Sequence, residues 1–282
     1  MKKIFAFIVL GSNLLIGSLF GQNVLDGAFI PENSSHRKVT PYAHLREADV
    51  LYSRRIWRVI DVREKMNQPF GLPKTPTPGG TRPRRALIDV IHDGIKNNSL
   101  QAYGQPEFDD EFTKPMTHAE IDALFLNMKS MNIEDSTGNP TPKDVPDPID
   151  AQKVKQFLVK EDWYFDKQRS VLDVRIIGIC PIKKKISESG EEVANMRLFW
   201  IYFPEARPLF AVAEMFNTKN DEERRTYDDV FWKREFSSFI FKESNVFDRK
   251  IEDVIKDGRD QLLESDKIKA SLFNWEHDLW HF

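Results

Sequence analysis

Apolar residues in the first half of the chain recur at intervals of three and four, which is the spacing of an amphipathic helix. The pattern predicts one helix over residues 45–65 and a second over residues 84–96. A third helix is predicted to begin at Thr117, because Thr117 and Glu120 have the spacing of a capping box, in which each side chain bonds the backbone N–H of the other. The first helix would carry four arginines beside its apolar stripe: Arg54, Arg55, Arg58 and Arg63.

The second half of the chain is rich in the β-branched residues typical of strands. Residues 170–180 and 196–203 each run to a proline, and a turn sequence at 187–190 lies between them, so we predict an antiparallel hairpin. Apolar residues on both faces indicate a sheet that is covered on both sides. Three further elements are predicted: a helix from Asn220 through Val230 or beyond, a short strand at 236–241, and a helix from Gln261 to Trp280. Helices and antiparallel strands in blocks favour an α+β fold.

Composition divides the chain into two lobes. Residues 129–150 contain four prolines and no apolar periodicity, which is typical of a linker or long surface loop. We therefore expect a smaller, mainly helical N-terminal lobe at residues 22–128. The C-terminal lobe, residues 151–282, is expected to be α+β, with helices packed on an antiparallel sheet.

Residues 1–21 form a predicted signal peptide. Lys2 and Lys3 precede an apolar run, and small residues lead to Gly21, which is the order of charge, apolar core and cleavage site in secreted proteins. The alternative is an N-terminal membrane anchor, but residues 11–13 interrupt an apolar run that is already short for spanning a bilayer. We expect cleavage after Gly21 and a soluble, exported protein that reaches a membrane only through partners.

The charge of the chain is small overall and unevenly distributed. The 282 residues include 41 Lys and Arg against 44 Asp and Glu, so the net charge of −3 gives no support for nucleic-acid binding. Residues 22–100 hold thirteen basic and eight acidic residues, a balance of +5, whereas residues 101–282 hold twenty-six and thirty-six, a balance of −10. Complementary fields could join such molecules head to tail, although an ordinary solvated surface explains the same pattern.

The sequence offers few residues for catalysis or metal binding. It contains no nucleophile elbow, phosphate-binding loop, dinucleotide fingerprint or zinc-protease motif. Its single cysteine, Cys180, is expected to be a core side chain rather than a nucleophile. His277 and His281 have the helical spacing of zinc ligands, but helix ends fray, so we expect no metal site. The carboxylates at 109–111 could act in acid–base chemistry, but a solvated acidic loop is favoured. We predict no cofactor and no catalytic residue.

Arginine and aromatic residues point instead to a protein interface. The chain has 21 Phe, 6 Trp and 6 Tyr, and aromatic residues and arginine are enriched where proteins bind each other. Guanidinium groups bind carboxylates through paired hydrogen bonds, and most of the chain is acidic. Arg54, Arg55, Arg58 and Arg63 are therefore candidate interface residues, with simple solvation of a helix as the alternative.

Several blocks of the sequence resemble one known family. Residues 57–69, which begin Trp-Arg-Val-Ile-Asp-Val-Arg-Glu, are similar to the first-lobe signature of GldN, a gliding-motility family called PorN in non-gliding relatives. Blocks of the second lobe resemble the family in order: residues 163–167, 175–181, 198–207, 216–220, 242–246, 262–269 and 273–280. The family-motif positions singled out within these blocks are Trp57, Cys180, Trp200, Pro204, Glu205, Arg207, Asn245, Trp275, His277 and Trp280.

The resemblance implies a structural protein rather than an enzyme. It implies a periplasmic component of the type IX secretion system of Bacteroidota, located at the inner face of the outer membrane. Proteins of this kind form a large ring with the outer-membrane lipoprotein GldK/PorK and contact the periplasmic domain of the motor protein GldM/PorM. No catalytic residue belongs to the family pattern. The competing interpretations are an exported hydrolase and a carbohydrate-binding protein, which would use acidic and aromatic residues.

Overall fold

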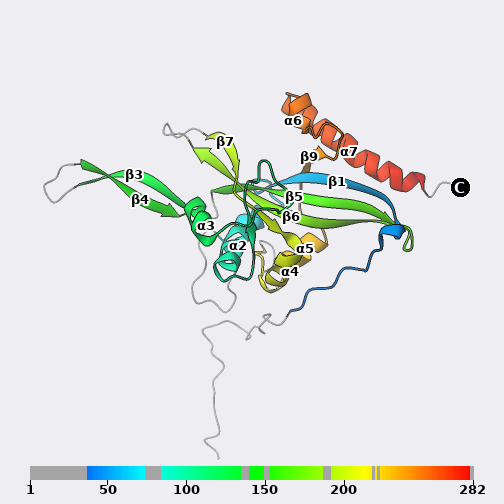
Figure 1. Ribbon diagram of the computed structural model, residues 1–282, viewed down its shortest axis with the longest axis horizontal. Coiled ribbons are helices and arrows are strands. Elements are labelled where there is room, and N and C mark those ends of the chain that lie inside the picture. The colour runs from blue at the N-terminus through cyan, green and yellow to red at the C-terminus, as the bar shows by residue number, and fades with distance from the viewer. Residues whose placement is uncertain are drawn as a thin grey trace, which may run out of the picture.

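The computed structural model describes residues 37–73, 84–134, 140–148, 153–186, 192–217, 220 and 223–279. Its main element is a seven-stranded antiparallel sheet with the order β2-β8-β6-β5-β1-β9, in which β7 also pairs with β6 (Figure 1). The strands are β1 Val50–Asp61, β2 Ala102–Tyr103, β5 Val154–Asp166, β6 Val171–Ile186, β7 Glu192–Arg197, β8 Trp200–Tyr202 and β9 Phe239–Glu243. Together with the helices that pack on this sheet, the arrangement confirms the predicted α+β class.

Strand β1 corrects the prediction of a helix over residues 45–65. A short 3-10 helix, Glu47–Asp49, leads into β1, which pairs with β5 on one side and β9 on the other. Successive side chains of a strand point to opposite faces, and both faces of β1 are covered, since Ile60 packs in one core cluster and Val59 in another. Residues 56–61 are consequently all buried. A strand buried on both faces loses its period of two, so its apolar residues matched helical spacing by coincidence.

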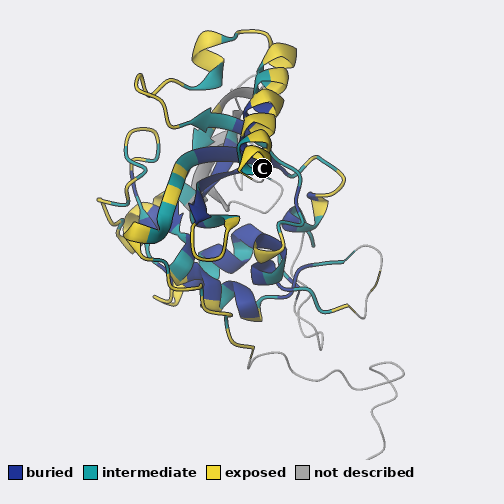
Figure 2. Ribbon diagram, turned by 90° about the vertical axis from the view of Figure 1, so that its right-hand side faces the viewer, coloured by how far each residue is buried: buried dark blue, intermediate teal, exposed yellow. Residues whose placement is uncertain are grey.

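Three helices cover one face of the sheet and enclose the main core (Figures 1 and 2). They are α2 Leu87–Lys96, α4 Phe203–Val212 and α5 Tyr227–Trp232. The apolar stripe of α2 is buried here, which confirms the helix predicted over residues 84–96. Four aromatic side chains pack together between these helices and the sheet: Phe70, Phe210, Tyr227 and Phe231.

One predicted helix start is confirmed and another is wrong. Helix α3, His118–Phe125, begins directly after Thr117. The backbone N–H of Thr117 donates to the Glu120 carboxylate at 2.8 Å, and that of Glu120 donates to Oγ1 of Thr117 at 3.4 Å, as a capping box requires. The helix expected to begin at Asn220 begins instead after Thr226, which caps α5 in a capping box of its own. The later signal sets the boundary because it directly precedes buried apolar residues.

The predicted hairpin has the expected antiparallel pairing but different ends. Strand β6 continues through Pro181, and its partner is divided into β7 and β8 by Leu198 and Phe199. The carbonyl of Pro181 accepts a hydrogen bond from the N–H of Leu198 at 3.0 Å, so the proline joins the ladder through the one backbone group it can use. The short strand expected at 236–241 is present as β9.

The long C-terminal helix α7, Gly258–Asp278, confirms the helix predicted there and follows a short helix α6, Ile251–Val254. It lies over β9 and the start of β1 (Figure 1), where Ile268 and Leu272 pack in a cluster with Ile240 of β9. Most of its remaining surface is exposed (Figure 2). Neither α7 nor any other helix in the described ranges has the length and apolar character that crossing a membrane requires.

A separate two-stranded sheet occupies most of the segment that we expected to be a linker or loop at 129–150. Strand β3, Leu126–Glu134, pairs antiparallel with β4, Pro140–Pro148, and this hairpin extends away from the main sheet (Figure 1). The lobe boundaries at 22–128 and 151–282 stay predictions. A mainly helical N-terminal lobe is not supported, because that part of the chain contributes β1 and β2 to the main sheet as well as helices.

Candidate interaction surfaces

The four candidate arginines lie along β1 or just after it, and each is beside a carboxylate of the same chain. The pairs are Arg54 with Glu243 at 3.3 Å, Arg55 with Asp162 at 2.7 Å, Arg58 with Glu161 at 3.2 Å, and Arg63 with Asp61 at 2.5 Å. They do not form one patch, because alternation along the strand sends Arg55 and Arg58 to opposite faces. Arg58 is buried within the chain, whereas the other three side chains are partly or largely exposed. An interface role for those three stays a prediction.

Arg58 belongs to a buried charged cluster. The Glu161 carboxylate lies 3.2 Å from Nε of Arg58 and 2.9 Å from Nη2 of Arg234, and it accepts a hydrogen bond from the Trp163 indole at 2.9 Å. Both guanidinium groups lie over the Trp163 ring, 5.5 and 5.3 Å from its centre. Burial lowers the pKa of Arg58, and the charge of Glu161 opposes that shift. The cluster joins β1, β5 and the segment after α5, so its role is to hold the fold together.

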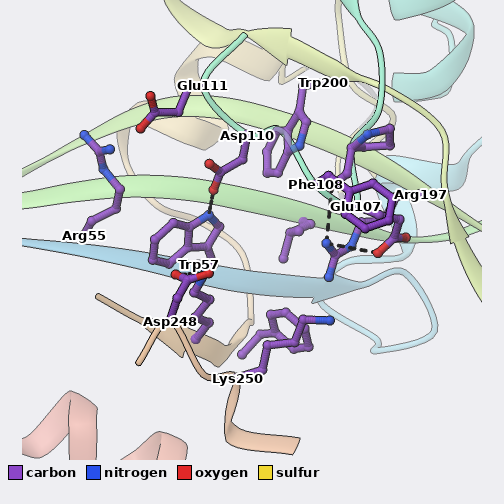
Figure 3. A pocket seen from close by; sticks show the side chains of 14 residues that line it. Arg55, Trp57, Glu107, Phe108, Asp110, Glu111, Arg197, Trp200, Asp248 and Lys250 are labelled. Atoms are coloured by element: carbon purple, nitrogen blue, oxygen red, sulfur yellow. Dashed lines mark hydrogen bonds and ion pairs between the residues drawn. The ribbon is translucent and has the colours of Figure 1, made fainter. Parts of the chain in front are cut away.

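A second surface lies on the other face of β1, around Trp57 (Figure 3). A cavity of about 230 Å³ opens there between β1, β9 and the loop that connects β2 to α3. Its lining combines aromatic rings with both signs of charge. We call it the Trp57 surface and define it by Arg55, Trp57, Glu107, Phe108, Asp110, Glu111, Arg197, Trp200, Phe241, Lys242, Asp248 and Lys250.

Lysines flank Trp57 on both neighbouring strands. Its register partners are Lys160 on β5 and Lys242 on β9, and the Lys242 ammonium lies 4.5 Å from the centre of the indole ring. The indole N–H donates to the Asp110 carboxylate at 2.8 Å, and that carboxylate lies 3.3 Å from Nζ of Lys160. The Lys160 side chain is only 2% exposed, and burial lowers its pKa while Asp110 opposes the shift. Asp110 therefore anchors the loop over the tryptophan and compensates a buried charge.

The three acidic residues at 109–111 have different surroundings. Asp109 accepts hydrogen bonds from two backbone N–H groups of its own turn, at 2.9 and 3.2 Å, Asp110 binds Lys160, and Glu111 is exposed. A solvated acidic loop therefore describes Asp109 and Glu111 better than Asp110, which is paired with a buried lysine. Of the two histidines considered for zinc, His281 lies outside the described residues. Within the described ranges no group of three or more His, Cys, Asp or Glu side chains could hold a metal ion.

The open rim of the Trp57 surface carries accessible contact groups. Phe108 is 95% exposed at its edge. Arg197 lies 3.4 Å from Glu107 and 5.4 Å from the centre of the Phe241 ring, over which the Lys250 ammonium also lies. Exposed aromatic groups next to cations are typical of protein interfaces. The arrangement suits binding of another protein.

Besides Trp57, three family-motif positions are buried, and a fourth, Trp275, is partly buried. Cys180 is fully buried, and burial raises the pKa of its thiol to about 12, so it is a core side chain as expected. Trp200 packs with Trp57 in the same buried cluster. The Arg207 guanidinium makes two hydrogen bonds to Asp228, at 2.8 and 3.2 Å, in a buried position. Trp275 stacks on a tyrosine of β1, with ring centres 4.0 Å apart.

The other motif positions lie nearer the surface or outside the described residues. The Asn245 side chain accepts two backbone hydrogen bonds, at 3.1 and 2.9 Å, and donates two more, so it fixes the turn after β9. Pro204 and Glu205 lie in the first turn of α4, where a missing N–H and a negative charge are both favourable. His277 is exposed on α7, and Trp280 lies outside the described residues. Asn245, Pro204 and Glu205 therefore stabilise local backbone structure.

Sequence reasoning missed the charged residues that hold β1 in place. Lys160 and Glu161 are consecutive in the middle of β5, a strand that is otherwise largely apolar. A charged side chain in such a strand must find a partner when both faces of the sheet are covered. The charged residues in the middle of β5 could therefore have predicted buried ion pairs. They could not have identified Asp110 or Arg234 as the partners.

Comparison with known proteins gives one family. No curated protein matches the chain. The family described as Gliding motility associated protein GldN matches residues 45–281, which is most of the chain. GldN is a structural gliding-motility family and not a known enzyme family. The protein therefore belongs to the GldN family and is a component of gliding motility and type IX secretion.

Proposed function

We propose that this protein is a periplasmic structural subunit of the type IX secretion system. In this proposal it forms a large ring with the outer-membrane lipoprotein GldK/PorK at the inner face of the outer membrane. It also couples that ring to the periplasmic domain of the motor protein GldM/PorM. The family match over residues 45–281 is the observation that carries the proposal.

The signal-peptide pattern at residues 1–21 supports the periplasmic location. The single cysteine, Cys180, is buried and lies far along the sequence from that segment, so it offers no site for an N-terminal lipid, and in this proposal attachment to a membrane depends on a partner. Mass spectrometry of protein purified from the native host should find a mature chain that begins near Gln22. An intact Met1 on the purified protein would contradict export by cleavage.

The Trp57 surface supports a role in assembly. Its carboxylates at Asp110 and Glu107 are engaged with cations of the same chain, whereas Phe108 projects into solvent at the rim. An accessible aromatic side chain on a charged surface is suited to bind a second protein. We therefore place one of the assembly contacts on this surface.

Co-expression of the protein with its lipoprotein partner tests the proposal directly. The two proteins should purify together as a particle far larger than either subunit, visible by sedimentation and negative-stain imaging. Phe108→Ala should lower the yield of such particles. Phe273→Ala, which removes another exposed phenylalanine on α7, is the matched control and should not. If the two proteins purify only as separate small species, the ring is wrong for this protein.

Loss of the protein should abolish type IX secretion without any substrate turnover being involved. Asp109→Asn removes a carboxylate of the acidic sequence that lies outside the Trp57 surface, and its amide oxygen can still accept a backbone hydrogen bond of the turn, so the variant should leave secretion intact. A folded Asp109→Asn protein that cannot secrete would favour the exported hydrolase instead.

A further inference from the structure

The two edges of the β3–β4 hairpin differ in backbone chemistry. Four of the nine residues of β4 are proline, and all four occupy alternate positions of the strand: 140, 142, 146 and 148. Proline has no N–H, so a strand accommodates it where that group would point away from the partner strand. In an antiparallel pair the direction of the backbone groups alternates with each residue. The even positions of β4 therefore face its outer edge, and the odd positions bond to β3.

The register of the pair shows which residues of β3 direct their backbone groups to the outer edge. Leu126 lies opposite Pro148, Ser130 opposite Asp144 and Glu134 opposite Pro140. Residues directly opposite each other in an antiparallel pair either both bond across the pair or both point outward. Every second residue of β3 consequently directs its N–H and C=O to the outer edge, and none of these residues is proline: Leu126, Met128, Ser130, Asn132 and Glu134.

The hairpin thus has one open edge and one blocked edge. The outer edge of β4 retains a single N–H donor, that of Asp144, whereas the outer edge of β3 has a complete row. Among the described residues β3 pairs only with β4, and the hairpin extends away from the main sheet (Figure 1). An unpaired strand edge with all its donors is a template for another strand, and proline is one of the devices that prevent such pairing.

We infer that β3 pairs antiparallel with β3 of a second copy of this chain, about a two-fold axis at Ser130. In this register Leu126 of one copy lies opposite Glu134 of the other, and Met128 lies opposite Asn132. All the outward backbone groups of both strands are then used, and no two like-charged residues occupy opposite positions.

The second copy is the occupant that the proline pattern favours. Two-fold pairing produces a four-stranded sheet, β4-β3-β3-β4, that consumes the only open edge of each hairpin. Both outer edges of that sheet then carry prolines, so addition stops at two copies. An added extended segment from another protein would instead leave its own outer edge unpaired. The contact is two-fold and closed, so it is distinct from the repeating contact of a ring and does not rest on the proposed function.

The mature, full-length protein tests the inference by its oligomeric state. Light scattering during size-exclusion chromatography should show a dimer that dissociates on dilution. Ser130→Pro removes a donor at the centre of the open edge and should weaken the dimer at least about tenfold, since it deletes hydrogen bonds at the axis in both copies. Asp144→Pro makes the same change at the facing position on the blocked edge and should leave the dimer unchanged. Circular dichroism and thermal melting establish that both variants keep the fold.

Cross-linking provides a measurement that does not depend on proline. Ser130→Cys places the same residue of both copies at the axis, where facing backbones are close enough for a disulfide. Mild oxidation should give a covalent dimer with Ser130→Cys and none with Asp144→Cys, and the native Cys180 does not compete because it is buried. A protein that is monomeric at every concentration, or a dimer that Ser130→Pro leaves intact and Ser130→Cys does not cross-link, overturns the inference. It is also overturned if Ser130→Pro acts only on binding to a different protein.

Discussion

Arg55 and Arg58 lie three residues apart on β1, and their partners Asp162 and Glu161 are consecutive on β5. The two ion pairs have similar lengths but different surroundings. The side chains of the outer pair are 38% and 27% exposed, whereas those of the inner pair are 6% and 0% exposed. Hydrogen bonds to Asp162 raise the pKa of Arg55, while burial lowers that of Arg58. The two faces of one strand therefore give the same residue type opposite electrostatic environments.

The comparison teaches that burial, rather than distance, decides what a charged pair does. An exposed pair contributes about 0–1 kcal/mol, because water screens both charges. Removing one member of a buried pair is far more damaging, since the other charge stays in the protein without compensation. The inner pair should therefore act on the stability of the fold. The outer pair remains accessible and could change partners on binding.

The sharpest test compares the two neighbouring carboxylates of β5. Glu161→Gln removes the charge shared by Arg58 and Arg234 and should lower the free energy of unfolding by about 3–5 kcal/mol. Asp162→Asn makes the equivalent change on the outer face and should lower it by less than about 1 kcal/mol. Chemical denaturation of the isolated subunit measures both. Equal losses of unfolding free energy in the two variants would contradict the idea that burial decides the contribution of each ion pair.

Asp110→Asn should have an intermediate effect. The amide can still accept a hydrogen bond from Trp57, but the buried ammonium of Lys160 loses its counter-charge, so we expect a loss of about 2 kcal/mol. Glu111→Gln, at the next position, is the control and should melt like the unmodified protein. Denaturation followed by tryptophan fluorescence reports on both. A loss in Asp110→Asn no greater than in the control would show that Lys160 does not need the carboxylate.

A smaller effect is expected from acid. Burial raises the pKa of Asp61, but hydrogen bonds from Arg63 and Gln156 outweigh burial and bring the pKa down from 3.8 to about 2. Because the folded value lies below the unfolded one, this stabilisation is complete above about pH 4 and is lost as the pH falls through about 2. After allowance for solvent screening, Asp61 should contribute about 1 kcal/mol to that loss.

Arg63→Gln should flatten this part of the curve of unfolding free energy against pH. Lys65→Gln, which removes an exposed charge two residues later, should leave its shape unchanged. Denaturation series at pH 4, 3 and 2 give the curves. An Arg63→Gln curve parallel to that of the unmodified protein would assign the low pKa to another cause.

The smallest effect on stability is expected from Arg54 and Arg55, the two partly exposed arginines of β1, and their substitution tests a role in assembly. Arg54→Gln with Arg55→Gln should change subunit stability by less than about 1 kcal/mol, because both side chains are partly solvated. The same double variant should lower the yield of large particles in co-expression, since a ring repeats each contact many times. Arg46→Gln is the control, as its partner Asp49 is three residues away on the same surface. If the double variant gives a normal yield of large particles even at low salt, these arginines make no assembly contact and are simply solvated.

The helices that could be predicted from sequence are those with one buried face or a local cap. Helices α2 and α7 show a single apolar stripe, and α3 has a local cap at Thr117, so their signals lie within a few residues. Strand β1 could not be predicted because its two covered faces remove the period of two. The β3–β4 hairpin was hidden by its prolines, whose meaning depends on a register that only pairing reveals.

The candidate site shows the same division. Arg54, Arg55 and Arg58 could be found as a cluster, but which of them is accessible depends on partners about a hundred residues away on β5 and farther on β9. The sequence shows which residues are neighbours along the chain, whereas burial depends on which residues are neighbours in space. Arg58 and Arg55 are indistinguishable by the first measure and clearly different by the second.

The position of β1 also has a consequence for the order in which the chain can fold. Val59 lies opposite Leu158 on β5 and opposite Phe239 on β9, so the strand near the start of the chain needs a neighbour made close to its end. Contacts this distant along the chain form slowly, because a long loop must close before they give any stabilisation. The sheet thus stays incomplete until nearly the whole polypeptide has been synthesised. A chain that cannot complete its sheet early stays unfolded for longer. A polypeptide passes through a narrow export channel in that unfolded state.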